Sequence, residues 1–202
     1  MWHDTRLLIA GLAVSVVTSL GAQTTGMPSF NAPYRAFQRS EFGAVVSFPD
    51  GSGTAFEGTY RYARGRFDIG VRAGMFDPGG AAKTKLLVGG EARQRVITHN
   101  ADFPLDGALV AGIGAALVSG GSGLFIPVGV SLGRRVEPHR SSISIVPYVQ
   151  PTAILISASG STDLNFTLGL GADFRLSRMF DARFSAGIGD LHGVSLAAVW
   201  VH

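Results

Sequence analysis

Three side chains near the C-terminus have the residue types of a hydrolytic triad. Asp190, His192 and Ser195 lie close together, and a carboxylate, a histidine and a serine can activate a nucleophile, as in membrane enzymes that modify lipids. A triad is defined by its geometry and not by closeness in the sequence. A lipid-modifying enzyme is therefore the weakest of the possible functions, and we predict no catalytic residue and no enzymatic activity.

The sequence gives little support for metal or cofactor chemistry. It contains no cysteine, which removes thiolate ligands, disulfides and thiol catalysis. The histidines after the N-terminal region fall mostly in expected connections, and their spacing places no two of them on one face of a strand as metal ligands. These histidines are His99, His139, His192 and His202. We predict neither a metal nor a cofactor.

Charged residues of both signs recur at alternate positions between apolar residues, and we predict that they face the inside of a barrel. They are Glu57, Arg61, Arg66, Asp68, Arg72, Glu91, Arg93, Asp173, Arg175, Asp181 and Arg183. Such a set can line a channel and determine its selectivity, or it can pair internally and fill a narrow barrel. We favour internal pairing, because a barrel of about ten strands has little free lumen once arginines fill it.

The elements that carry these charges are predicted to be strands. Between residues 164 and 177, apolar side chains alternate with polar residues and glycines, a period of two that no helix produces. The same alternation, or a weaker form of it, defines ten segments separated by turn-forming residues. These segments are 42–48, 56–62, 66–75, 86–92, 109–117, 126–132, 143–155, 164–177, 180–188 and 194–200.

Short connections join these segments, so neighbours in sequence are expected to pair as hairpins. The predicted fold is all-β: an up-and-down antiparallel transmembrane β-barrel of about ten strands, with eight as the alternative, after an N-terminal signal peptide. Pro147 and Pro151 fall within one segment and predict a bulged or edge-like position there. An even strand number places both ends of the barrel on the same side of the membrane, which we expect to be the periplasm.

Composition favours a barrel in a membrane over a barrel in water. Charged residues make up 15% of the 202-residue chain and hydrophobic residues 46%, whereas soluble domains typically carry about 25% charged residues. A soluble lipocalin-like carrier would point its apolar face inward, and a membrane barrel points that face at lipid. The other face carries glycine, serine and arginine, which suits a narrow polar lumen better than a water-facing surface.

The N-terminal region predicts export. An apolar run from Leu7 to Leu20 follows Arg6 and precedes the small residues Gly21 and Ala22, as in a cleaved signal peptide. We therefore divide the chain into a signal peptide (1–22), an N-terminal leader segment (23–39) and a barrel domain (40–202). The leader segment is open to three interpretations: a loose leader, part of the first strand, or a plug inserted into the barrel.

The C-terminal segment resembles the end of a known family. The sequence from Gly193 to His202, preceded by the alternating strands that begin at Leu164 and Phe180, is similar to the small bacterial outer-membrane β-barrel proteins of the opacity/OmpA-like type. That resemblance implies an outer-membrane location, contact with outer-membrane lipid and insertion by the barrel-assembly machinery. Members of the family usually end on an aromatic residue, whereas this chain ends on His202, with Trp200 two residues earlier.

The expected function is a structural or surface-interaction role for a barrel with a narrow, polar, charge-paired lumen. A small channel for polar solutes and a soluble periplasmic ligand carrier are the main alternatives. Nucleic acid is not an expected partner, because the formal charge is only +3 and the arginines are scattered.

Overall fold

The computed structural model describes residues 24–33, 39–50, 53–137 and 143–202. The predicted signal peptide and His139 lie outside these ranges. Within them, no helix is long and apolar enough to cross a membrane.

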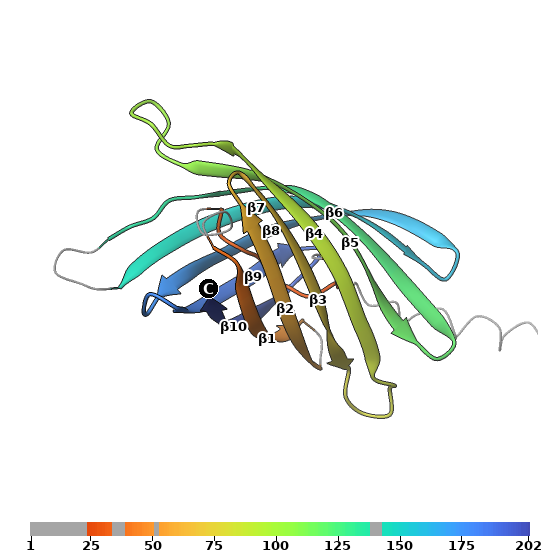
Figure 1. Ribbon diagram of the computed structural model, residues 1–202. Helices are drawn as coiled ribbons and strands as arrows, with labels where there is room; N and C mark the ends of the chain where they lie inside the picture. Colours follow the sequence, from red (N-terminus) through yellow and green to blue (C-terminus); the bar gives the residue numbers. More distant parts are fainter. Residues whose placement is uncertain (1–23, 34–38, 51–52, 138–142) are drawn as a thin grey trace, which may run out of the picture.

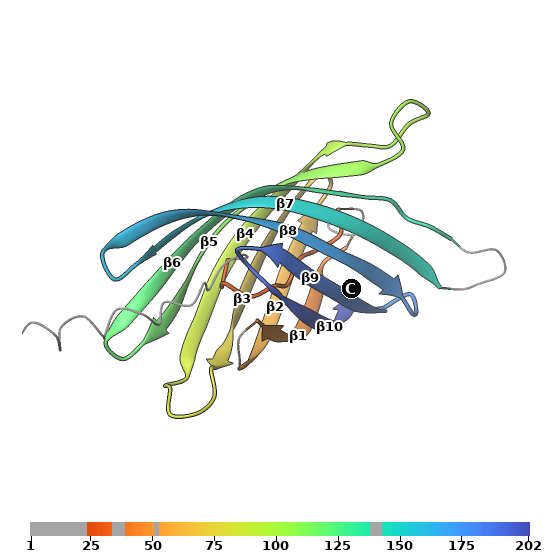
Figure 2. The ribbon, with the colours of Figure 1, turned by 180° about the vertical axis from the view of Figure 1, so that it is seen from behind.

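Ten antiparallel strands form one closed barrel, in which each strand pairs with its neighbours in sequence and β1 pairs with β10. Figures 1 and 2 show this ring from opposite sides. The strands are β1 (Glu41–Pro49), β2 (Thr54–Arg64), β3 (Phe67–Asp77), β4 (Lys85–Ile97), β5 (Asp106–Val118), β6 (Gly121–Gly133), β7 (Ser144–Ala158), β8 (Ser161–Arg175), β9 (Phe180–Gly189) and β10 (Gly193–Val201). The predicted up-and-down barrel of ten strands is confirmed.

Alternation along each strand separates two faces. In β3, Asp68 and Arg72 are buried inside the barrel, whereas Ile69, Val71 and Met75 are more than half exposed on its outside. Large apolar side chains occupy the outer face of every strand. A soluble lipocalin-like barrel has the opposite arrangement, with its main apolar face turned inward, so the soluble alternative does not fit this exterior.

The two prolines of β7 do not create the bulge or edge that the sequence predicted. β7 keeps one register with β8 along its whole length and pairs with β6 on its other side. Both prolines point outward, and pairing with β6 is interrupted between Thr152 and Val149, where Pro151 has no N–H to donate. The barrel's register shift lies instead between β4 and β5, at Arg95 and Ile97.

An arginine in the middle of the outer face tests whether this surface meets lipid. Val71→Arg lies midway along β3 on the outside, and we expect it to lower the free energy of unfolding in lipid vesicles by about 2–4 kcal/mol. Leu164→Arg, near the hairpin end of β8 on the same face, should cost at most about 1 kcal/mol. Equal costs at the two depths, measured by urea titration, would contradict a bilayer around the barrel.

Candidate functional site: the filled lumen

Residues 24–33 lie inside the barrel, and all ten are buried. Both ribbon views show this orange-red segment within the ring of strands. Its end at Pro33 lies against Gly133, beside the mouth where β6 ends, and its other end at Thr24 lies against Gly114, towards the opposite mouth. Of the three interpretations of the leader segment, residues 24–33 correspond to the inserted plug.

The barrel wall has glycine where this segment passes closest. A Cβ atom added at Gly114 would lie 1.6 Å from the carbonyl oxygen of Thr24, and one at Gly89 would lie 2.7 Å from its hydroxyl oxygen. A Cβ atom at Gly169 would lie 2.5 Å from the ring of Phe30. These distances exclude any larger residue unless the segment moves, so the wall is shaped to hold residues 24–33.

Polar contacts tie the segment to several strands. The hydroxyl of Thr25 donates to Glu57 at 2.7 Å. Ser185 on β9 donates its hydroxyl to the carbonyl oxygen of Pro28 at 3.0 Å and accepts from the backbone N–H of Phe30 at 3.3 Å. The segment is therefore held through its backbone by β9 and through the Thr25 side chain by β2.

Asn31 makes the largest number of polar contacts in the segment. Its side-chain oxygen accepts from Arg183 at 3.0 Å, its amide donates to Glu91 at 3.5 Å, and its backbone carbonyl accepts from Ser131 at 2.9 Å. These partners lie on β9, β4 and β6, so a single asparagine connects distant parts of the wall.

Apolar packing holds the same segment. Met27 and Phe30 belong to a buried cluster that also contains Phe76, Leu87 and Phe125 from the wall. Other members of the cluster are Ala32, Ala55, Ala116, Val146, Tyr148, Ile154 and Leu191. The expectation of a polar lumen is thus wrong for part of the interior, because the segment has apolar side chains that need apolar partners.

Arg61 is the centre of a buried charge network. Its guanidinium donates to Asp68 on β3 at 2.7 Å, binds Glu91 on β4, and lies 3.5 Å from Glu41 on β1. The Arg93 guanidinium shares Asp68 at 3.1 Å. Buried ions need such close compensation, since the interior solvates them poorly.

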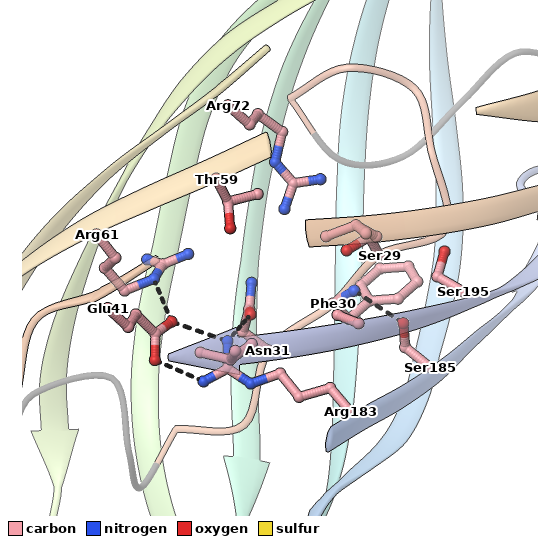
Figure 3. A pocket seen from close by; sticks show the side chains of 13 residues that line it. Ser29, Phe30, Asn31, Glu41, Thr59, Arg61, Arg72, Arg183, Ser185 and Ser195 are labelled. Atoms are coloured by element: carbon pink, nitrogen blue, oxygen red, sulfur yellow. Dashed lines mark hydrogen bonds and ion pairs between the residues drawn. The ribbon is translucent and has the colours of Figure 1, made fainter. Parts of the chain in front are cut away.

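Arg183 is the second centre. It makes two hydrogen bonds to the Glu41 carboxylate, at 2.8 and 2.7 Å, and its Nε lies 3.1 Å from Asp173 on β8. Figure 3 shows Glu41 between the guanidinium groups of Arg61 and Arg183. Separately, Arg72 lies 3.5 Å from Glu57.

These ion pairs run along the wall. Arg61 on β2, Gly70 on β3 and Glu91 on β4 form one row across the sheet. A Cβ atom at Gly70 would lie 3.2 Å from the Arg61 guanidinium, so this glycine allows the arginine to lie flat across β3 and reach Glu91. The charged side chains therefore line the lumen, and residues 24–33 occupy its centre.

The structure buries most of the charged residues that the sequence placed in the lumen. Those buried are Glu57, Arg61, Asp68, Arg72, Glu91, Arg93, Asp173, Asp181 and Arg183. Arg175 is half-buried at the end of β8. Arg66 is a correction: it lies exposed in the turn between β2 and β3, because β2 ends at Arg64 and Gly65, with φ of +67°, reverses the chain before it.

Sequence reasoning missed two buried carboxylates, Glu41 and Asp106. Each begins its strand one or more residues before the expected boundary. Extending the alternation backwards from Leu109 would have placed Asp106 on the inner face. For Glu41 the signal was weaker, because the adjacent apolar residues Val45 and Val46 obscure which face of β1 points inward.

The cavity between residues 24–33 and the barrel wall is small. A cavity of about 20 Å³, measured as the space open to the centre of a water molecule, lies between Phe30, Arg72, Arg183 and Ser195 (Figure 3). Such a volume holds about one water molecule. No solute larger than water fits there while residues 24–33 stay in place.

Two residues of the possible triad, Asp190 and Ser195, have other partners. Ser195 donates its hydroxyl to Ser47 at 2.7 Å inside the barrel, and Asp190 accepts from the backbone N–H of Phe166 at 2.7 Å. His99 lies 3.0 Å from Asp106 near one mouth. Across the described residues, no three histidine or acidic side chains are grouped to hold a metal ion.

Comparisons with known proteins support the fold. No family model and no curated protein matches the sequence. Among solved structures, the β domain of the Bordetella autotransporter BrkA is 13% identical, with a TM-score of 0.50 over 81% of this chain and 98% of that one. A de novo designed transmembrane β-barrel is 16% identical, with a TM-score of 0.41 over 82% of this chain and 97% of that one.

The likeness to the BrkA domain concerns the fold alone. It agrees with the closed antiparallel ring and with the apolar outer face described above. Together these features define the class of the protein, a transmembrane β-barrel.

Removing the central arginine tests how much the network stabilises the barrel. Arg61→Met leaves the carboxylates of Glu41, Asp68 and Glu91 without their shared partner, and losing one side of a buried ion pair typically costs about 3–5 kcal/mol. Arg64→Met, on an exposed position of the same strand, should change the free energy of unfolding by less than about 0.5 kcal/mol. Similar effects of the two substitutions would show that the network contributes no stability.

Proposed function

We propose that this protein is an outer-membrane β-barrel with a lumen closed to solutes, which serves a structural or surface-interaction role. The observation that carries the proposal is the filled interior, where residues 24–33 and the charge network occupy the lumen and the cavity beside Phe30 and Arg183 has a volume of only about 20 Å³. A constitutive channel for polar solutes needs a continuous water-filled path. An enzymatic role is not part of the proposal, because Ser195 and Asp190 bond to other groups.

The outer surface supports a bilayer environment. Phe42 on β1 contacts two other rings: that of Tyr60 on β2 is tilted against it with centroids 4.7 Å apart, and that of His202, directly after β10, stacks on it with centroids 5.1 Å apart. Trp200 and Phe180 continue this patch on the neighbouring strands. Outer-membrane barrels carry such aromatic side chains at the level of the lipid headgroups.

The patch also bears on insertion. In the family that the C-terminal sequence resembles, the last strand usually ends on an aromatic residue, and here the His202 ring that follows β10 stacks on Phe42. We therefore propose that this end of β10 is what the barrel-assembly machinery recognises. Outer-membrane lipid is the other proposed partner.

A surface role is supported at the hairpin between β7 and β8. These two strands are the longest of the barrel, with fifteen residues each, and Ser161, Thr162 and Asp163 beside their turn are exposed. A polar hairpin tip of this kind is compatible with an aqueous partner beyond the membrane.

Two measurements test the proposal. After expression with its predicted signal peptide, we expect the protein in the outer-membrane fraction. It should migrate faster on a gel before boiling than after it, because a closed barrel resists detergent. In planar bilayers it should give no steady conductance above the lipid background, because the lumen is filled. Steady wild-type conductance would contradict a closed lumen, and recovery in the soluble periplasm would contradict the membrane location.

A further inference from the structure

Residues 24–33 are held differently from the ten strands. None of them pairs with a strand, and no strand pairing depends on them. Hydrogen bonds through side chains, such as those of Thr25 and Asn31, and the packing of Met27 and Phe30 hold them in the lumen. The segment can therefore leave without breaking the ring of hydrogen bonds between strands.

We propose that residues 24–33 are a displaceable plug, and that the barrel conducts small cations when the plug leaves the lumen. This inference rests on the proposed function, since it assumes a barrel that spans a membrane and is closed at rest. The inference adds a second, open state of the barrel, in which ions pass through the lumen.

The space left by the plug is large enough for ions. The wall is a continuous hydrogen-bonded ring, which cannot collapse inward without exposing backbone groups to lipid. An extended chain occupies a cross-section of roughly 5 Å by 10 Å, so its departure leaves a passage of about that size. The arginines do not obstruct it, because Arg61 lies along the wall over Gly70 and Arg183 bonds to acidic residues of the wall.

The charge of the wall favours cations. Seven carboxylates and four arginines are buried in the described strands. The carboxylates are Glu41, Glu57, Asp68, Glu91, Asp106, Asp173 and Asp181, and the arginines are Arg61, Arg72, Arg93 and Arg183. Three further basic side chains of the strands, Lys85, Arg95 and Arg175, are only half-buried and lie at or near the ends of β4 and β8, so the excess of negative charge belongs to the buried part of the wall. Rings of acidic side chains select cations in other pores.

The first test removes the plug. In a variant lacking residues 24–33, faster gel migration before boiling than after it shows that the barrel has closed. We expect this closed barrel to give steady conductance in planar bilayers where the wild type gives none. In a salt gradient, the sign of its reversal potential should show a preference for cations over anions. A synthetic peptide of residues 24–33 should reduce that conductance, and a scrambled peptide of the same composition should not.

The second test keeps the full chain and locks the plug. Phe30 lies directly against Gly169 on β8, so Phe30→Cys together with Gly169→Cys places two thiols opposite each other in a chain that has no other cysteine. The oxidised protein should stay closed, and reduction should open it, because the large apolar side chain of Phe30 is gone. Phe30→Cys alone is the matched control and should show no dependence on reduction.

The outcomes separate this inference from the proposed function. A closed deletion variant without conductance, or one that prefers anions, would overturn the inference and leave the closed barrel intact. Failure of the two cysteines to form a disulfide would overturn it too, because the segment would then not lie at Gly169. Conductance in the fully oxidised protein would instead contradict the proposed closed lumen itself.

Discussion

The structure depends on one constraint: every backbone N–H and C=O group that crosses a bilayer must be paired within the protein. Ten strands satisfy it by closing into a ring, with β10 returning to β1. Closure determines the two faces at once. Apolar side chains such as Val71 meet lipid, and the charged side chains midway along the strands, such as Asp68, face the lumen.

A ring of ten strands then has an interior that must be filled. Side chains of the wall do not fill it alone, and the protein adds residues 24–33. The wall accommodates them by omitting side chains where the segment passes, at Gly89, Gly114 and Gly169. Glycine, which weakens a strand elsewhere, here allows two backbones to approach closely.

The charge network solves a second problem of the same interior. Four buried arginines would be costly if unpaired, and the structure shares carboxylates between them: Glu41 serves Arg61 and Arg183, and Asp68 serves Arg61 and Arg93. Because partners lie on nearby strands, the pairs also fix the positions of β1, β2, β3 and β4 relative to one another. The plug joins this network through Asn31, which contacts Arg183 and Glu91.

The sequence by itself determined the strands, their approximate number, their antiparallel order and, for most positions, the face of each side chain, because alternation with period two is a local property. It placed Asp68, Arg72 and Arg183 on the inner face, where the structure buries them, and failed at Arg66, where a turn interrupts the alternation. Only the tertiary structure decided which charges pair and where residues 24–33 lie. Asn31 and Arg183 are 152 residues apart. They meet only once the ring has closed around residues 24–33, and no local pattern in the sequence identifies such partners.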